Sequence, residues 1–473
     1  MSFYFKNITT HNYISFTKSF IINSSIFEAF YYFYQMPLLI ISLGILFLFL
    51  LIMVFRLNAF IAFILVSIAI GIGQGMELNT IVISIEKGIG NTLGFLVMIL
   101  GLGAMLGKLV AESGAAQKIT NGLIAFFGVK NTKTAVMITG FVVGITMFYS
   151  VGFVILVPLV FTVASATGLS LISIALPMLA ALSVTHGFLP PHPAPSALSI
   201  MFEADIGKTL LYGIVVAIPS ILISGPLLTR FIPKVEAKPL KEFMASKIFE
   251  ESDLPSLSNS LLTALLPVLL IGFSTITLNF LTSGSTIFSL IEFLGNPVIA
   301  LLLSLLIGIY TLGLSRGNSM EEVMKIFGTA ASGITMVLLI ISGAGALKQI
   351  LIDSGVSEYI GSLLETTSLS PLILAWLIAT LIRFSVGSAT VAGLTTAGIV
   401  LPLVQSSGVS PELMVLAIGS GSLMLSHVND SGFWLFKEYF NLSIKDTLST
   451  WTVMETSIGI SGLLGVLVLE NFI

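Results

Sequence analysis

The chain has 473 residues, of which 56% are hydrophobic and 9% are charged, with a formal net charge of −3 and a mean hydropathy of +1.07. Soluble domains carry about 25% charged residues, so this composition excludes a surface that faces water all round and predicts an all-α polytopic protein of the lipid bilayer. The absence of cysteine excludes disulfides and thiolate metal sites, and the small net charge indicates no nucleic-acid partner.

Residues 1–35 form a polar and aromatic N-terminal tail. They lack the apolar core and the small-residue cleavage site of a signal peptide, and a 20-residue apolar run begins at Met36. Two interpretations stay open: a peripheral tail at the membrane surface, or a non-native extension in front of a natural start at Met36.

Apolar runs of the length that crosses a bilayer, about 20 residues, recur along the rest of the chain. They predict spans at residues 36–55, 57–75, 89–111, 170–187, 209–231, 259–281, 293–314, 323–346, 409–426 and 447–470. Glu77, Glu86 and Lys87 are predicted to lie in a short loop.

Two further apolar stretches, 134–166 and 371–404, are too long for one span and are interrupted at 149–152 (YSVG) and 384–387 (FSVG). Each is predicted to form two half-helices that meet at a polar tip, as a re-entrant hairpin or a discontinuous span.

Short motifs recur in the same order in the two halves of the chain, with an offset near 241 positions. Residues 58–62 pair with 296–300, 101–104 with 343–346, 113–114 with 354–355, 149–152 with 384–387, 157–160 with 401–404, 167–170 with 407–410, and 185–186 with 426–427. We therefore predict a first repeat over 36–231, a linker over 232–258 and a second repeat over 259–473.

The distribution of Lys and Arg predicts the orientation of these repeats. The segment 230–247 holds five such residues and is expected in the cytoplasm, whereas 353–370 holds three acids and no base and is expected outside. The two repeats would then have inverted topology, each with five spans and one re-entrant hairpin, an architecture typical of secondary transporters.

The segment 183–195 (SVTHGFLPPHPAP) ends an apolar span and contains two histidines and four prolines. Proline stops the helix, and the freed carbonyl groups need partners or a water-lined cavity. Thr185 and His186 either line a substrate or proton path, or His186 is a packed histidine and the prolines only end the helix.

The matching segment 426–434 (SHVNDSGFW) contains Asn429 and Asp430. Ionisable groups at membrane depth usually face a cavity or a partner, so Asp430, with His427 beside it, is the strongest candidate to carry a proton. The alternative is that Asn429, Asp430 or Ser431 caps the next helix.

The hairpin tips supply a third set of candidates. Ser385, Gly387, Ser388 and Thr390 at the second tip combine hydroxyl groups with helix-end N–H groups that suit an anion or a polyol. Arg383 either binds a substrate carboxylate or anchors the hairpin on carbonyl groups or a protein acid. Ser150 and Gly152 are the candidates at the first tip, next to Tyr149. Close helix packing is the alternative for these small residues.

Segments 101–114, 183–195, 387–392 (GSATVA), 410–421 (SPELMVLAIGSG) and 426–439 (SHVNDSGFWLFKEY) resemble the gluconate permease family, from about Met36 to the C-terminus. The resemblance implies proton-coupled symport of gluconate or a related small sugar acid across the bacterial inner membrane, without a cofactor, a metal or enzymatic activity. It also implies the broad ion-transporter superfamily, in which homodimers with a scaffold and an elevator-type transport domain are common. The residues it marks are His186, His192, Ser388, Thr390, His427, Asn429 and Asp430.

One position departs from the family pattern, in which an acidic residue often stands where this chain has Ser150. Other substrates (D-serine, glycerate or fructuronate) and sodium coupling therefore stay open. A membrane-embedded metalloenzyme is disfavoured because the chain has four histidines and no HExxH pattern, and a channel is disfavoured by the inverted repeat with its broken helices.

Overall fold

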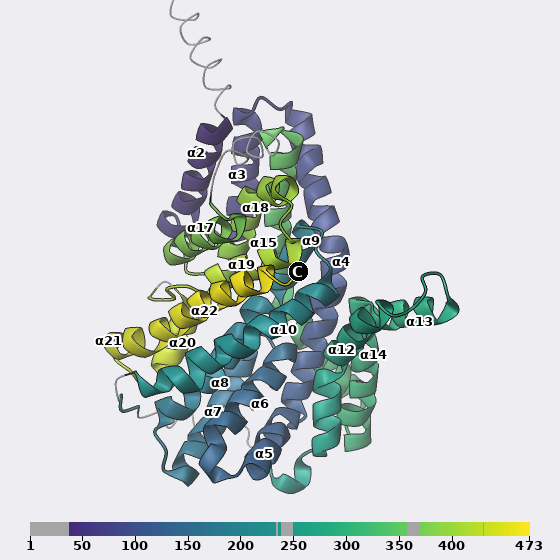
Figure 1. The fold of residues 1–473 in the computed structure, drawn as a ribbon, viewed down its shortest axis with the longest axis vertical. Helices are drawn as coiled ribbons and strands as arrows, with labels where there is room; N and C mark the ends of the chain where they lie inside the picture. Colours follow the sequence, from purple (N-terminus) through teal and green to yellow (C-terminus); the bar gives the residue numbers. More distant parts are fainter. Residues whose placement is uncertain (1–36, 233–234, 238–248, 357–368, 429) are drawn as a thin grey trace, which may run out of the picture.

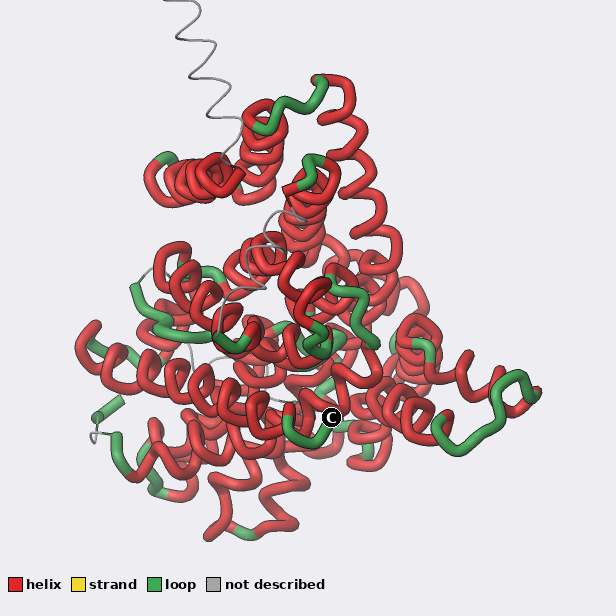
Figure 2. Tube along the Cα trace, turned by 45° about the horizontal axis from the view of Figure 1, so that its top comes forward, coloured by secondary structure: helices red, strands yellow, loops and turns green. Residues whose placement is uncertain are grey.

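The computed structural model describes residues 37–232, 235–237, 249–356, 369–428 and 430–473 (Figure 1). All regular elements in these ranges are helices joined by loops (Figure 2). The predicted tail 1–35, Asn429, and parts of the linker and of the acidic segment 353–370 lie outside the described residues.

The first half contains α2 to α10 and their flanking turns. They are α2 (Pro37–Phe49), η1 (Leu50–Val54), α3 (Ala59–Gly73), α4 (Leu78–Glu112), α5 (Ala115–Phe127), η2 (Val129–Asn131), α6 (Thr132–Thr146), α7 (Tyr149–Thr167), α8 (Leu171–Phe188), α9 (Pro193–Met201), α10 (Ile206–Leu222), η3 (Ile223–Leu227) and η4 (Leu228–Arg230).

The second half contains α12 to α22. Its elements are η5 (Glu251–Asp253), α12 (Leu257–Leu278), α13 (Thr286–Gly295), α14 (Pro297–Gly308), η6 (Ile309–Gly313), η7 (Leu314–Arg316), α15 (Met320–Asp353), α17 (Pro371–Val386), α18 (Ala389–Ser407), α19 (Pro411–Gly421), α20 (Ser431–Tyr439), α21 (Ile444–Thr447), η8 (Leu448–Thr452) and α22 (Val453–Glu470).

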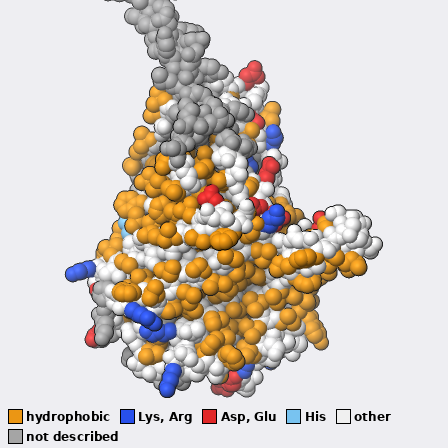
Figure 3. Space-filling view, viewed as in Figure 1, with side chains coloured by type: hydrophobic (Ala, Val, Ile, Leu, Met, Phe, Trp, Pro, Cys, Tyr) orange, Lys and Arg blue, Asp and Glu red, His pale blue; other side chains and the backbone are white. Residues whose placement is uncertain are grey.

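Seven helical segments of the described chain are long and apolar enough to cross a membrane, and each coincides with a predicted span. They are Leu78–Glu112, Leu171–Met201, Ile206–Arg230, Leu257–Leu278, Pro297–Arg316, Met320–Asp353 and Ile444–Glu470. The predicted spans at 36–55, 57–75 and 409–426 correspond to shorter apolar helices. Hydrophobic side chains cover the face shown in Figure 3 and continue onto the arm built by α12, α13 and α14.

Helix α4 has 35 residues and is longer than the span predicted from residue 89. The prediction of a loop at Glu86 and Lys87 is wrong, because both residues lie within α4. Ile81, Ser84 and Gly88 recur at helical spacing on the buried face of this stretch, while Glu86 and Lys87 point outward and are exposed. The two charges thus lie on the exposed face of a helix whose opposite face is buried.

Helix α15 packs along α4 with close backbone contact. A Cβ atom added at Gly88 would lie 2.4 Å from the carbonyl oxygen of Gly345, and one added at Gly345 would lie 2.7 Å from the carbonyl oxygen of Gly88. Small residues at such a crossing let two helices approach within backbone contact. The pair Gly88 and Gly345 therefore fixes how the two longest helices cross.

Several of the paired motifs adopt the same local structure in both halves. Asn58 caps α3 and Asn296 caps α14, each through a side-chain oxygen that accepts from the backbone N–H two residues on, at 2.9 and 3.0 Å. The paired glycines have the same left-handed backbone, with φ of 79° and 74° at Gly114 and Gly355, and 69° at both Gly168 and Gly408.

Element lengths also recur in chain order. Helices α4 and α15 have 35 and 34 residues, α7 and α18 have 19 each, and α9 and α20 have nine each.

Both long apolar stretches are broken into two helices, as the sequence predicts. The first break lies at Met147–Phe148, between α6 and α7, so that Ser150 and Gly152 fall in the first turns of α7. The second lies at Gly387–Ser388, between α17 and α18, where Gly387 has a φ of 79°. Helix α6 packs on α8, and α17 packs on α19.

Replacing Gly88 with alanine should destabilise the fold, because the added Cβ would press on the backbone of α15. Overpacking of this kind costs about 1–3 kcal/mol. The apparent melting temperature of the purified protein in detergent measures the effect. Gly90, on the same helix, has no neighbouring atom within 4 Å of an added Cβ, so Gly90→Ala should leave the melting temperature unchanged or raise it slightly. Equal melting temperatures for the two variants would contradict this account of the crossing.

Candidate functional site

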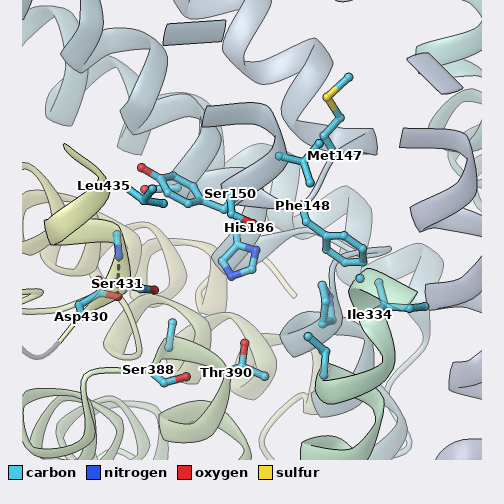
Figure 4. Close-up of a pocket in the computed structure, with 18 of the residues that line it drawn as sticks. Met147, Phe148, Ser150, His186, Ile334, Ser388, Thr390, Asp430, Ser431 and Leu435 are labelled. Atoms are coloured by element: carbon cyan, nitrogen blue, oxygen red, sulfur yellow. Dashed lines mark hydrogen bonds between the residues drawn. The ribbon is translucent and has the colours of Figure 1, made fainter. Parts of the chain in front are cut away.

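A cavity of about 670 Å³ lies where the two helix breaks meet the C-terminal end of α8, the start of α20 and the start of α22. Parts of α4 and α15 complete its wall. Seven of the predicted site residues line it: Ser150, His186, Arg383, Gly387, Ser388, Thr390 and Asp430. In the view of Figure 4, His186 lies between Ser150 on one side and Ser388 and Thr390 on the other.

A buried ion pair forms one side of the cavity. The Nη2 atom of Arg383 lies 2.5 Å from Oδ2 of Asp430, and the two side chains are 3% and 13% exposed. The Nη1 atom of Arg383 donates to the carbonyl oxygen of Gly387 at the end of α17. The guanidinium therefore joins the second helix break to the segment that opens α20, which is the anchoring interpretation of Arg383.

Asp430 has two further partners. Its Oδ1 atom accepts from the N–H of Gly432 at 3.0 Å, which caps α20, and its Oδ2 atom accepts from the hydroxyl of Ser426. The indole N–H of Trp451 donates to the same Ser426 hydroxyl at 2.8 Å. Asp430 is therefore both a helix cap and the counter-ion of a buried arginine, and its role as a proton carrier stays a prediction.

A second carboxylate, that of Glu455 in α22, also lines the cavity and was not predicted as a site residue. It is 2% exposed, and its Oε1 atom accepts from the hydroxyl of Ser183 in α8. It has no Lys or Arg within 4 Å among the described residues. Glu455 is the single charged residue between Asp446 and Glu470. An ionisable residue inside a span is by itself a functional signal, and that signal could have found it.

Three polar atoms on the cavity wall are buried without a hydrogen-bond partner within the described ranges: the hydroxyl of Tyr149, Nδ1 of His186 and Nε of Arg383. Buried polar atoms are nearly always paired in folded proteins. Because all three residues line the same cavity, these atoms are suited to hydrogen-bond a polar ligand.

The other two histidines of the predicted set have local partners. His192 is buried, with Nε2 at 2.5 Å from the carbonyl oxygen of Gly144, and its ring lies 5.4 Å from that of His186. His427 stacks on Phe384 at 4.8 Å between ring centroids, and its Nδ1 atom lies 2.9 Å from the carbonyl oxygen of Leu425. Neither histidine lines the cavity.

Three more predicted residues do not line the cavity. Gly152 packs against Leu182, and the hydroxyl of Thr185 donates to the carbonyl oxygen of Leu182 at 2.9 Å. The hydroxyl of Ser385 donates to the carbonyl oxygen of Leu381 at 2.9 Å. Asn429 lies outside the described residues.

A double-mutant cycle should detect the Arg383–Asp430 ion pair as non-additive changes in the melting temperature. Asp430→Asn leaves a buried guanidinium without its counter-charge, which costs about 3–5 kcal/mol. The double variant Arg383→Gln/Asp430→Asn should melt at a higher temperature than Asp430→Asn alone, because it removes the unpaired charge. Glu438→Gln, which breaks the exposed pair with Lys437, is the control and should change the melting temperature little. Additive losses in the cycle would contradict the pairing.

Comparisons with known proteins identify the family of this chain. Residues 36–473 match the profile of the GntP family permease. The Gnt-II system L-idonate transporter of Escherichia coli K12 is 49% identical over 92% of this chain and 99% of its own length. A high-affinity gluconate transporter of the same organism is 49% identical over 93% and 100%, and the gluconate permease of Bacillus subtilis is 47% identical over 92% and 99%.

Two solved transporters share the fold at low sequence identity. The Alcanivorax borkumensis YdaH transporter is 18% identical, with a TM-score of 0.62 over 87% of this chain and 97% of its own. Neisseria gonorrhoeae MtrF, from a class of antimetabolite efflux pumps, is 17% identical, with a TM-score of 0.56 over 81% and 82%.

The curated relatives named here are transporters and permeases, which confirms the expectation of a transporter rather than an enzyme. Together with the apolar helices they support a multi-pass protein of the bacterial inner membrane. The match over residues 36–473 and the identity over most of each relative agree with the motifs in the sequence. The chain therefore belongs to the GntP family of permeases.

Proposed function

We propose that this permease carries gluconate or a related small sugar acid into the cell by proton-coupled symport with alternating access. The observation that carries the proposal is the cavity, which combines both helix breaks, a buried cation and two carboxylates. Relatives at 47–49% identity are named as gluconate or L-idonate transporters, and this supports a sugar acid as the substrate.

The chemistry of the cavity wall suits a sugar acid, which has one carboxylate and a row of hydroxyl groups. Ser150, Ser388 and Thr390 offer hydroxyls around His186 (Figure 4). A volume of about 670 Å³ lies in the range of small-molecule sites. A sugar acid can therefore be bound mainly through its hydroxyl groups.

The substrate carboxylate is best accommodated at the second helix break. The Arg383 guanidinium already binds Asp430 through Nη2 and Gly387 through Nη1, and its buried Nε has no partner among the described residues. The N-terminus of α18, which Ser388 caps, adds the positive end of a 19-residue helix. This arrangement favours a single-contact role for Arg383 over a bidentate clamp.

Alternating access follows from the architecture that we propose around the cavity. The recurring element lengths and the matching caps support two repeats, and the distribution of Lys and Arg along the sequence favours inverted topology. In such an arrangement the two hairpins belong to a moving transport domain, and the remaining helices form the scaffold of a homodimer. Gly107 of α4 lies against the first hairpin, because an added Cβ would sit 2.2 Å from the carbonyl oxygen of Thr146. This contact is a candidate sliding surface.

Proton coupling fits the charge of the substrate. Moving one anion into a cell that is negative inside costs about 2.3 kcal/mol per 100 mV, and one co-transported proton removes that cost. Of the proton-coupling residues predicted from sequence, His186 and Asp430 line the cavity, while His427 packs on Phe384 beside it.

The test is uptake of radiolabelled gluconate into proteoliposomes under imposed gradients. An inward proton gradient should drive accumulation, and an inward sodium gradient at equal pH should not. Unlabelled L-idonate, fructuronate, glycerate and D-serine, added as competitors, rank the substrates. Accumulation that follows sodium would replace the proposed coupling. Absence of gluconate accumulation, with labelled D-serine accumulated in its place, would replace the proposed substrate.

Thr390→Val should weaken gluconate binding, because it removes a cavity hydroxyl at nearly constant volume. One lost hydrogen bond of about 1.4 kcal/mol raises the KM roughly tenfold. Ser385→Ala removes a hydroxyl that belongs to the neighbouring turn of α17 and does not line the cavity, so its KM should match the wild type. Initial uptake rates over a range of gluconate concentrations measure both values. An unchanged KM in Thr390→Val would exclude this hydroxyl from the binding site.

A further inference from the structure

We propose that Glu455, held by Ser183, and not Asp430, is the carboxylate that takes up and releases the transported proton. This inference rests on the proposed proton-coupled function and names the residue that performs the coupling. It rests on the different surroundings of the two carboxylates that line the cavity.

Asp430 is bound as an anion by several donors. It pairs with Arg383, accepts from the hydroxyl of Ser426 and accepts from the N–H of Gly432. A proton on Asp430 would break the ion pair and leave a buried guanidinium without its counter-charge, at a large energetic cost. Asp430 is therefore better suited to hold the second hairpin on α20 than to be protonated in every cycle.

Glu455 has one hydrogen-bond donor, Ser183, and no cation at ion-pair distance in the part of the chain that the structure describes. Its side chain is buried on a helix whose one other charged residue, Glu470, is at the exposed end. Burying a carboxylate without a cation is costly, and taking up a proton removes that cost. Glu455 also lines the cavity, so a proton can reach it by the same route as the substrate.

The titratable groups around Glu455 come from several elements. Helix α7 presents Tyr149, α8 presents His186, α17 presents Arg383, and Asp430 precedes α20, while Lys108 of α4 also lines the cavity. Helices α10 and α19 also pack on α22, but no described residue of either lines the cavity. The Arg383 charge attracts the ionised form of Glu455, and the Asp430 charge repels it.

These charges explain how a proton and a substrate anion can be coupled. A sugar-acid carboxylate bound near Arg383 adds a negative charge to the cavity that Glu455 shares. The added charge repels ionised Glu455 and favours its neutral form, so substrate binding promotes proton binding. By linkage, the proton on Glu455 strengthens substrate binding by the same factor. The proton enters from the outer solution, stays on the Glu455 carboxyl during the conformational change, and leaves to the cytoplasm.

The decisive experiment compares Glu455→Gln with wild type in proteoliposomes. Glutamine mimics the neutral form, so exchange of internal for external gluconate at equal pH should persist and lose its dependence on pH. Accumulation driven by a proton gradient should fall at least tenfold. Glu470→Gln, at the exposed end of the same helix, is the matched control and should accumulate gluconate like the wild type.

Each outcome separates this inference from the proposed function. Normal proton-driven accumulation by Glu455→Gln would overturn the role of Glu455 and leave symport intact. Loss of accumulation with retained exchange in Asp430→Asn, but not in Glu455→Gln, would move the proton site to Asp430. A wild type that ignores the proton gradient would refute the proposed symport itself.

A second variant covers the case in which Glu455→Gln does not elute as a folded protein in size-exclusion chromatography. Ser183→Ala removes the hydrogen bond to Glu455 and keeps the carboxylate. The pH profile of gluconate exchange should then move by about one pH unit, the equivalent of one hydrogen bond to a charged group. A profile identical to that of the wild type would overturn the inference.

Discussion

The ion pair between Arg383 and Asp430 is the interaction on which the organisation of the site depends. A charge inside a membrane protein has to be neutralised locally, and here each partner comes from a different part of the second half. Arg383 ends the first arm of a broken helix and Asp430 opens α20, so their pairing fixes the second helix break beside α20. The hydroxyl groups of Ser388 and Thr390 take their positions in the cavity from that anchor.

Much of this arrangement could be predicted from sequence, because several motifs carry local chemistry. Asn58 and Asn296 lie just before apolar runs and cap helices in the structure. The long apolar stretches had to break, and they do. The first break nevertheless lies at Met147 and Phe148, just before the predicted interruption at 149–152. The sequence could not place it there, because neither residue is a helix breaker. Helix α6 packs on α8, 25 or more positions further along the chain, and no local pattern reports such a contact.

The site itself was only half predictable, for reasons that differ from residue to residue. Arg383 and Asp430 were both singled out, but they are 47 positions apart, and no spacing rule relates a hairpin tip to a helix cap. His427 matches His186 in the repeated motif, yet it stacks on Phe384 outside the cavity. Glu455 was not predicted as a site residue, because no motif surrounds this acid in its apolar stretch. Its partner Ser183 lies 272 positions away.

The three charged groups in the cavity give a simple account of the proposed proton coupling. Lys108 is paired with Glu112 on the same helix, so that pair adds no net charge. In the empty carrier, Arg383, Asp430 and ionised Glu455 sum to one negative charge. When a substrate anion and a proton on Glu455 are both present, the sum is again one negative charge. In the proposed cycle the cavity therefore carries the same charge in both directions of the conformational change, and the membrane potential does not distinguish the loaded from the empty carrier. In this proposed cycle the gradients of protons and substrate set the direction of transport. A carrier with substrate but no proton would have an uncompensated second negative charge in a low-dielectric site.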